Sequence, residues 1–292
     1  MAILGRHICL QGRVQGVGFR PFVWHLAREA QLKGHVRNDG TGVQIEAWGT
    51  KDALDSFLAK LVENPPPLAN IAQVTWKDLA GDAPMQAFFI AHSDHGPVRA
   101  EITPDAATCS ACLADIRDPA NRRYRYPFTN CTHCGPRLSI ITGIPYDRAQ
   151  TTMRKFTMCG DCQREYSDPS DRRFHAQPNA CPACGPQLWL EDEHGPIACA
   201  DPVSEAARKL RQGQIIAIKG IGGFHLACDA TDAAVVQRLR DKKNRIAKPF
   251  AIMAKNLALI RGFCQLADAE ADLLTAPAAP IVLLLKHDQG LP

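Results

Sequence analysis

Cys109-Ser110-Ala111-Cys112 and Cys131-Thr132-His133-Cys134 form a pattern of two Cys-x-x-Cys pairs that this chain carries twice. The second copy lies fifty residues further on, as Cys159-Gly160-Asp161-Cys162 and Cys181-Pro182-Ala183-Cys184. Eighteen residues separate the two pairs in each copy, and each copy closes with Cys-Gly-Pro. This spacing is typical of a tetrahedral zinc site with four cysteine ligands. The repeat therefore predicts a small metal-stabilised module in the middle of the chain.

The simplest assignment of ligands gives one Zn²⁺ ion to each copy of the repeat, although the spacing also allows an interleaved pairing. The predicted ligands are Cys109, Cys112, Cys131 and Cys134 for one ion, and Cys159, Cys162, Cys181 and Cys184 for the other. Four thiolates complete the tetrahedron and leave no open position for catalysis, so we expect two structural ions. His133 and His175 lie nearby but exceed this count, and we predict that they are not ligands.

Length and composition limit the number of domains and the classes of function that the chain can have. A length of 292 residues corresponds to about two domains, or three if one is a small metal module. The apolar content is 46% and the net charge is +4, which suits a globular protein with a phosphorylated substrate and does not require nucleic acid. We find no signal peptide and no apolar run long enough to span a membrane. We therefore expect a cytoplasmic protein whose cysteines bind metal rather than form disulfides.

The segment before the repeat alternates between strand and helix patterns. A helix is expected to open at Pro21, and a second amphipathic helix follows from Leu54 to Val62. The expected strands are His7–Gln11, Gly34–Arg37, Val43–Trp48, Val74–Lys77 and Ala87–Ala91. The order β-α-β-β-α-β is that of the ferredoxin-like fold.

A glycine-rich turn lies between the first expected strand and helix of this segment. Backbone N–H groups in such a turn converge on one point, and the following helix N-terminus adds partial positive charge, so the turn can hold a phosphate. Arg20 can bind phosphate oxygens with two N–H groups. The predicted phosphate-binding residues are Gln15, Gly16, Val17, Gly18, Phe19 and Arg20.

The string Gly12-Arg13-Val14-Gln15-Gly16-Val17-Gly18-Phe19-Arg20 resembles the acylphosphatase signature, and residues 34–43 resemble the second motif of that family. The resemblance implies that Arg20 binds the phosphoryl group and that Asn38 orients the attacking water. Both would be catalytic residues, without a metal at this site. The alternative is an acylphosphatase fold that is kept only as a binding module.

Arginines flanked by aromatic residues follow the first and third cysteine pairs. They are Arg122, Arg123, Arg125, Arg172 and Arg173. One hypothesis is a surface that contacts nucleic acid or a nucleotide. The other, which we favour, is a solvated face that pairs with Asp118 and Asp168.

The segment after the repeat is expected to form a helix over 203–212, a buried strand over 215–218, a glycine loop, a helix over 232–241 and a further strand over 251–254. The apolar run 280–285 reads as another buried strand. A strand, glycine loop, helix and basic turn suit a nucleotide triphosphate. The predicted nucleotide- and carbamoyl-binding residues are Lys219, Gly222, Gly223, His225, Lys243, Arg245 and Lys248.

This last segment resembles part of the YrdC-like domain, whose members form carbamoyl-adenylates from ATP. Lys243-x-Arg245 and Lys248-Pro249 match a motif of that family. Residues 219–226 depart from the string that YrdC proteins carry at this place, which favours an acceptor other than that of threonylcarbamoyl chemistry.

The three segments in this order resemble the HypF-type carbamoyltransferases of [NiFe]-hydrogenase maturation, as do the strings 172–178 and 219–229. The implied fold is α+β and multidomain: a ferredoxin-like acylphosphatase domain (1–92), a double zinc-finger module (100–190) and a partial YrdC-like α/β domain (200–292). The resemblance implies hydrolysis of carbamoyl phosphate, formation of carbamoyl-AMP from ATP, with Mg²⁺, and transfer to the C-terminal cysteine of a maturation protein.

On this interpretation the zinc repeat is a rigid spacer between the two sites, and the chain is a fragment that binds zinc and hydrolyses acyl phosphates but cannot complete transfer. Two other functions stay open. One is an independent acylphosphatase with a zinc-stabilised appendage. The other is a zinc-finger protein that binds nucleic acid.

Overall fold

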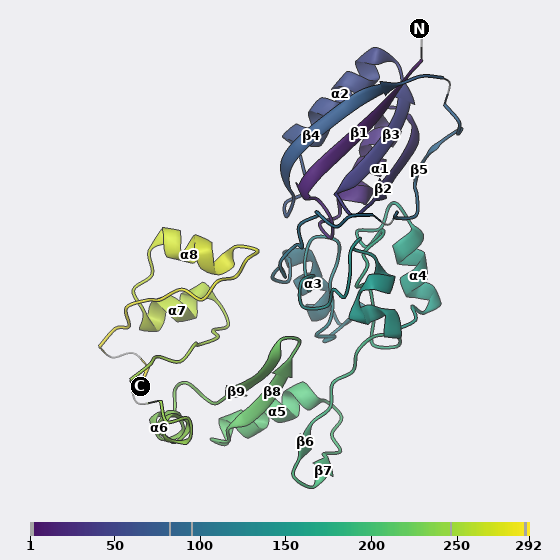
Figure 1. Cartoon of the computed structure of the whole chain (residues 1–292). Coiled ribbons are helices and arrows are strands. Elements are labelled where there is room, and N and C mark those ends of the chain that lie inside the picture. Colours follow the sequence, from purple (N-terminus) through teal and green to yellow (C-terminus); the bar gives the residue numbers. More distant parts are fainter. Residues whose placement is uncertain (1–2, 82, 95, 246, 289–290) are drawn as a thin grey trace. The chain divides into compact units, whose positions relative to one another are not determined.

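The computed structural model describes residues 3–81, 83–94, 96–245, 247–288 and 291–292. The chain divides into two compact units, Met1–Pro186 (unit 1) and Gln187–Pro292 (unit 2) (Figure 1). The glycine-rich turn and the cysteine repeat therefore belong to the same compact unit. None of the helices in these described ranges has both the length and the apolar character that crossing a membrane requires.

A five-stranded sheet with the order β4-β1-β3-β2-β5 forms the first part of unit 1. The strands are β1 (Leu4–Arg13), β2 (Lys33–Asn38), β3 (Val43–Gly49), β4 (Asn70–Leu79) and β5 (Phe88–Ile90). The helices are α1 (Phe19–Glu29) and α2 (Lys51–Glu63). All neighbouring strands are antiparallel except β2 and β5, which are parallel. The expected ferredoxin-like order is confirmed, and β5 adds an edge strand to it.

The core of this part is apolar and closed. Ile8 of β1 and Ile45 of β3 lie opposite each other, and Val23 of α1 and Phe57 of α2 pack into the same cluster. Burial of a large apolar side chain contributes about 1.5–3 kcal/mol. This cluster can therefore hold β1 and α1, which flank the glycine-rich turn, in place without a metal.

Helix α1 begins at Phe19, two residues before the expected start at Pro21. Gly18 caps it in a left-handed conformation with φ 78°, which glycine adopts without strain. Proline is tolerated two residues later because the first-turn N–H groups have no partner within the helix. The turn thus leads straight into the helix N-terminus.

The cysteine repeat contains little regular structure. Its elements are α3 (Ser110–Arg117), η1 (Arg148–Gln150), η2 (Thr152–Lys155) and α4 (Gly160–Ser167). Cys109 and Cys159 occupy the N-cap positions of α3 and α4. One of its buried clusters consists of the cysteines Cys112, Cys131 and Cys134 themselves. A module with so small an apolar core is the kind that a structural metal stabilises.

Unit 2 consists of short helices and two small hairpins. Its elements are β6 (Glu191–Asp192), β7 (Gly195–Pro196), α5 (Pro202–Arg211), β8 (Ile216–Gly220), β9 (Gly223–Ala227), α6 (Ala233–Lys242), α7 (Leu257–Phe263) and α8 (Asp268–Thr275). The helices expected over 203–212 and 232–241 are confirmed as α5 and α6.

Two strand expectations for unit 2 were wrong, and a third was wrong about burial only. Residues 251–254 and 280–285 form no strand, and the run 280–285 is not buried, since Ile281 is 80% exposed and Leu283 83% exposed. The strand expected as buried at 215–218 is β8, which pairs only with β9 and is largely exposed. An apolar run becomes a buried strand only where strands on both sides and a covering layer exist, and a two-stranded hairpin provides a single neighbouring strand.

Candidate functional site

The glycine-rich turn between β1 and α1 forms the floor of a pocket. Gly16 and Gly18 have φ values of 73° and 78°, and Val14 and Val17 are fully buried beneath the turn. The buried valines fix the turn to the core, while the glycines permit the left-handed backbone. The predicted phosphate-binding residues 15–20 therefore lie together at one place, on a turn that ends in a helix N-terminus.

Gln15 has a structural task that sequence analysis missed. Its side-chain Nε2 donates to the carbonyl oxygens of Asp39 (2.7 Å) and Gly42 (2.8 Å). Its Oε1 accepts from the backbone N–H of Tyr146 (2.9 Å), and its own carbonyl accepts from Thr103 (2.6 Å). With these groups occupied, any phosphate contact by Gln15 would come from its backbone N–H.

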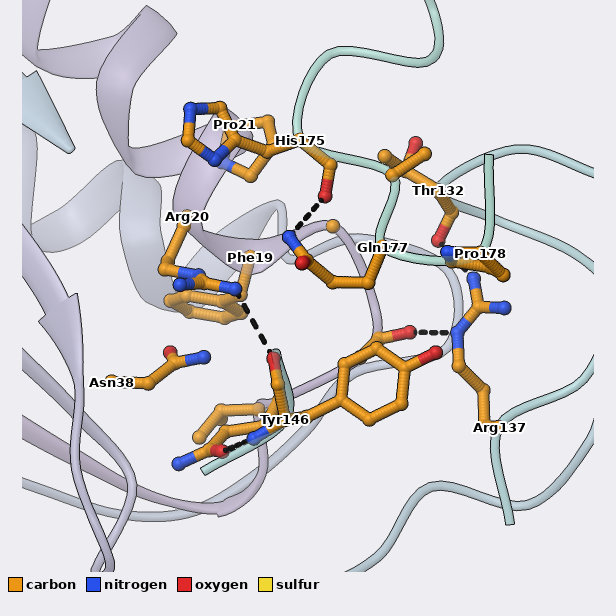
Figure 2. A pocket seen from close by; sticks show the side chains of 15 residues that line it. Phe19, Arg20, Pro21, Asn38, Thr132, Arg137, Tyr146, His175, Gln177 and Pro178 are labelled. Atoms are coloured by element: carbon orange, nitrogen blue, oxygen red, sulfur yellow. Dashed lines mark hydrogen bonds between the residues drawn. The ribbon is translucent and has the colours of Figure 1, made fainter. Parts of the chain in front are cut away.

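The two predicted catalytic residues, Arg20 and Asn38, lie side by side over the turn (Figure 2). Arg20 Nη2 forms an ion pair with Asp147 Oδ1 (2.7 Å) and donates to the carbonyl oxygen of Tyr146 (3.2 Å). Asn38 is 1% exposed, and its Oδ1 has no hydrogen-bond partner. An unpaired buried amide oxygen is unfavourable, and its presence beside a buried arginine marks a position for a ligand or water.

The cysteine repeat forms the other wall of this pocket, which the sequence patterns did not indicate. It contributes Thr132, Arg137, Tyr146 and residues 175–178 (Figure 2). The cavity measures ≈ 20 Å³, enough for about one water molecule. The string 172–178 stood out in the sequence, but only as a family feature without a role. The repeat covers the glycine-rich turn, which the interpretation as a spacer did not include.

Arg137 connects the first zinc knuckle to the phosphate turn. It is 2% exposed, and its Nε donates to the carbonyl oxygen of Gly16. Its Nη2 donates to the carbonyl oxygens of Cys131 (3.0 Å) and Thr132 (2.9 Å), and its Nη1 to that of Cys134 (3.1 Å). A side chain placed on Gly16 would meet Arg137 at 3.3 Å, so glycine also permits this close approach.

The eight predicted zinc ligands form two clusters, each within one copy of the repeat. Sulfur–sulfur distances along the cluster edges are 3.5–3.7 Å in the first and 3.6–3.8 Å in the second. Four sulfurs at the usual Zn–S distance of ~2.3 Å would lie about 3.8 Å apart, so both clusters fit a zinc ion. The sulfur atoms gather within each copy, which is the arrangement that the simpler pairing predicts, and the two clusters consist of cysteines without His133 or His175.

We expected the arginines of the repeat to pair with Asp118 and Asp168. Instead, four of them have partners in the opposite copy of the repeat. Arg122 donates to Cys162 Sγ (3.2 Å) and Arg172 to Cys112 Sγ (3.0 Å). Arg122 and Arg123 pair with Glu165, while Arg172 and Arg173 pair with Asp115.

The expected solvated face is wrong for Arg123 and Arg173, which are 1% and 5% exposed, whereas Arg122 and Arg125 are exposed. Buried guanidinium groups need internal partners, and a carboxylate in the facing copy provides one. Four of the five arginines proposed for nucleic-acid contact are therefore engaged inside the module.

The predicted nucleotide-binding residues lie on two separate elements of unit 2. Lys219 and His225 stand on the β8–β9 hairpin, whose turn is Ile221-Gly222, so the glycine stretch closes a hairpin rather than opening a helix. Lys243, Arg245 and Lys248 follow α6, and Arg245 donates to the carbonyl oxygen of Pro249 (2.8 Å). Among the described residues, no hydrogen bond or salt bridge joins the hairpin to this basic segment.

Removing one crossing arginine should weaken zinc binding in the opposite copy. Arg172→Met removes a donor to Cys112 Sγ, and loss of such outer-shell partners lowers metal affinity about 10–100-fold. We expect zinc to pass to a chromophoric chelator at lower chelator concentration than in the wild type. Arg164→Met, which removes an exposed arginine of the same module, is the control. Equal zinc retention in both variants would contradict the prediction.

The free energy of unfolding of unit 1 should decrease as the pH is lowered, because burial favours the neutral form of His175. Burial, reinforced by the charge of Arg20, lowers the pKa of His175 to about 4. In the unfolded chain the pKa is ~6.5, so the unfolded state takes up the proton first as pH falls. The stability due to the neutral imidazole is complete above pH ~6.5 and is lost progressively down to about pH 4, by at most ~1.4 kcal/mol per pH unit.

His175→Asn should flatten this dependence. Asparagine tolerates the left-handed backbone of His175, where φ is 55°. Denaturant unfolding between about pH 7.5 and 5.5, with zinc saturating, measures the slope. His194→Asn, at an exposed histidine, should keep the wild-type slope, and so would His175→Asn if the assignment were wrong.

Three family models match the chain. The Acylphosphatase model matches residues 6–90, the HypF finger model matches 108–141 and 158–191, and the model described as Telomere recombination, which covers Sua5 and YrdC proteins, matches 208–292. They follow the boundaries of the sheet domain, the two cysteine clusters and most of unit 2.

Curated relatives match nearly the whole chain. Carbamoyltransferase HypF2 of Cupriavidus necator is 52% identical over 283 residues, covering 96% of this chain and 35% of that protein. Carbamoyltransferase HypF of Rhodobacter capsulatus is 52% identical over 95% of this chain and 37% of its own length. The chain thus spans about a third of the length of these relatives.

Two solved structures cover 99% of the chain. One is full-length HypF in the phosphate- and nucleotide-bound form, with a TM-score of 0.94, 44% identity and 38% of that chain covered. The other is T. kodakarensis HypF, with a TM-score of 0.89, 43% identity and 37% covered. Through its acylphosphatase, zinc-finger and YrdC-like parts, the chain belongs to the HypF family.

Proposed function

We propose that unit 1 hydrolyses carbamoyl phosphate to carbamate and inorganic phosphate. The observation that carries this proposal is the placement of Arg20 beside the unpaired, buried Oδ1 of Asn38 above the glycine turn. Arg20 neutralises phosphate oxygens, and Asn38 Oδ1 accepts a hydrogen bond from the attacking water. The water oxygen bonds to phosphorus while the bond from phosphorus to the acyl oxygen breaks, and carbamate leaves.

The chemistry asks little more of the site than this. An acyl phosphate is already activated, so positioning the water and neutralising the phosphoryl charge supply most of the rate. Backbone N–H groups of residues 15–19 and the N-terminus of α1 assist Arg20. The choice of carbamoyl phosphate among acyl phosphates is supported by the names of the relatives, which are carbamoyltransferases.

We further propose that unit 2 contributes to the reaction of carbamate with ATP, which yields carbamoyl-AMP and pyrophosphate. Lys243, Arg245 and Lys248 would neutralise phosphate charge together with Mg²⁺, and the β8–β9 hairpin would supply Lys219, Gly222, Gly223 and His225. Support comes from the match to the YrdC model and from the solved HypF that carries phosphate and nucleotide. The carbamoyl group would then pass to the C-terminal cysteine of a partner protein in [NiFe]-hydrogenase maturation.

The two zinc ions have a structural role in this proposal. Four cysteine sulfurs would fill the ligand positions of each ion, so neither ion would have a position for substrate. Each ion would hold a knuckle in place, and Arg137 passes that constraint to the phosphate turn.

Substitution of either catalytic residue should abolish hydrolysis while leaving the fold. Arg20→Ala and Asn38→Ala should each lower kcat/KM for carbamoyl phosphate by roughly 10²-fold or more, because each removes a preorganised polar group at the reacting centre. Phosphate release measures the rate, and zinc content with circular dichroism verifies the fold. Arg28→Ala, on the same helix α1, should retain wild-type kinetics. Unchanged rates in the first two variants would refute the assigned roles.

Coupling between the two units should appear as ATP–pyrophosphate exchange that depends on carbamoyl phosphate, measured on the full-length protein. Arg20→Ala should lose this exchange, and freshly dissolved ammonium carbamate should restore it. Lys243→Ala should lose exchange under both conditions, because its defect lies at the nucleotide. Hydrolysis without any exchange would instead favour an independent acylphosphatase with a zinc-stabilised appendage.

A further inference from the structure

The phosphate-binding arginine already holds an anion that belongs to the protein. Asp147 Oδ1 lies 2.7 Å from Arg20 Nη2, and the same nitrogen donates to the carbonyl oxygen of Tyr146. Arg20 Nη1 donates to Ser93 Oγ (3.3 Å). Both terminal nitrogens of the guanidinium, Nη1 and Nη2, thus have partners at the place where a phosphoryl group would bind.

Asp147 belongs to the cysteine repeat, and the chain presents it firmly. Its neighbour Tyr146 accepts a hydrogen bond from Arg20 and donates its backbone N–H to Gln15 Oε1 (2.9 Å). Its other neighbour, Arg148, donates to the carbonyl oxygens of Gln177 (2.6 Å) and Phe156 (2.6 Å). Asp147 itself is the N-cap residue of η1, yet its side chain makes no capping bond, so the carboxylate is directed to Arg20 instead.

Charge and space both oppose simultaneous binding of Asp147 and a phosphoryl group. Two anions within a few ångströms repel strongly where water is largely excluded, and Arg20 is only 8% exposed. The cavity of ≈ 20 Å³ accepts about one water molecule, whereas an acyl phosphate is several times larger. A phosphoryl group can therefore take its place on Arg20 only when the Tyr146–Asp147 segment withdraws from the guanidinium.

We propose that Asp147 is the resting partner of Arg20 and that the phosphoryl group displaces it together with the Tyr146 carbonyl, so that the Tyr146–Asp147 segment opens and closes the acyl phosphate site. This inference rests on the proposed hydrolysis at Arg20 and Asn38. Asp147 acts as an internal competitor of the substrate: it keeps the buried guanidinium paired when the site is empty and lowers the affinity of the site for phosphate. The ion pair reforms when the product phosphate leaves.

Asp147→Asn tests the proposal, because it removes the competing charge and retains the shape. Inorganic phosphate should bind about 10-fold more tightly, measured as inhibition of hydrolysis and by titration calorimetry. KM for carbamoyl phosphate should fall by a similar factor. Asp147→Glu retains the charge and should restore wild-type phosphate affinity.

A matched control lies in the same sheet domain. Arg6, like Arg20, is a buried arginine, and it pairs with the more exposed Asp55 at 2.9 Å. Asp55→Asn removes an equivalent ion pair outside the pocket and should leave phosphate affinity unchanged. Equal or weaker phosphate binding in Asp147→Asn, or a fall in kcat at constant KM, would overturn the proposal, since a residue that only aligns Arg20 gives that result.

A measurement on the wild type covers the case in which Asp147→Asn does not fold. Saturating phosphate should speed hydrogen exchange in the peptide around Tyr146, whose N–H is bonded to Gln15 in the resting state. Unchanged or slower exchange would contradict displacement. If the wild type binds phosphate and hydrolyses carbamoyl phosphate but Asp147→Asn gains no affinity, only this inference fails. If the wild type does neither, the proposed function fails and this inference with it.

Discussion

The guanidinium of Arg137 is the buried cation that joins the glycine turn of the sheet domain to the first cysteine knuckle. It is buried at the contact between the first zinc knuckle and the phosphate turn, and it donates to carbonyl oxygens on both sides. A buried cation without partners is very unfavourable, so the turn and the knuckle must remain together for the charge to be satisfied. The geometry of the proposed acyl phosphate site consequently depends on cysteines more than a hundred residues away from the glycine turn.

The crossed arginines extend the same constraint through the repeat. Each copy supplies a carboxylate and a cysteine thiolate to the arginines of the other, so neither cluster is an isolated finger. Metal ligation would fix the knuckles, the arginines fix one knuckle against the other, and Arg137 fixes the first knuckle against the turn. The repeat therefore forms a connected wall of the site, against which the Tyr146–Asp147 segment can move.

Local patterns in the sequence predicted those structural features that depend on residues close together in the chain. Cysteine spacing predicted the two clusters, and the glycine turn between a strand and a helix predicted where Arg20 lies. Partners distant in the sequence were beyond such reasoning: Asp115 and Glu165 pair across the repeat, and Asp147 reaches Arg20, through contacts that no spacing rule encodes. The strand predicted over the apolar run 280–285 was wrong for a related reason. The apolar pattern of a segment is compatible with a strand, but it does not show whether a partner strand is present.

Several crossing contacts from the first copy of the repeat have equivalent contacts from the second copy, made by the corresponding residues. Arg122 reaches Cys162 as Arg172 reaches Cys112, and Arg123 Nε donates to the carbonyl oxygen of Ala180 as Arg173 Nε donates to that of Asn130, always with the same shift of fifty residues. This is the contact pattern of an isologous homodimer, in which one surface patch binds a copy of itself about a two-fold axis. The two copies thus behave as a dimer whose subunits share one chain, and a change in one copy acts on the ligands of its twin.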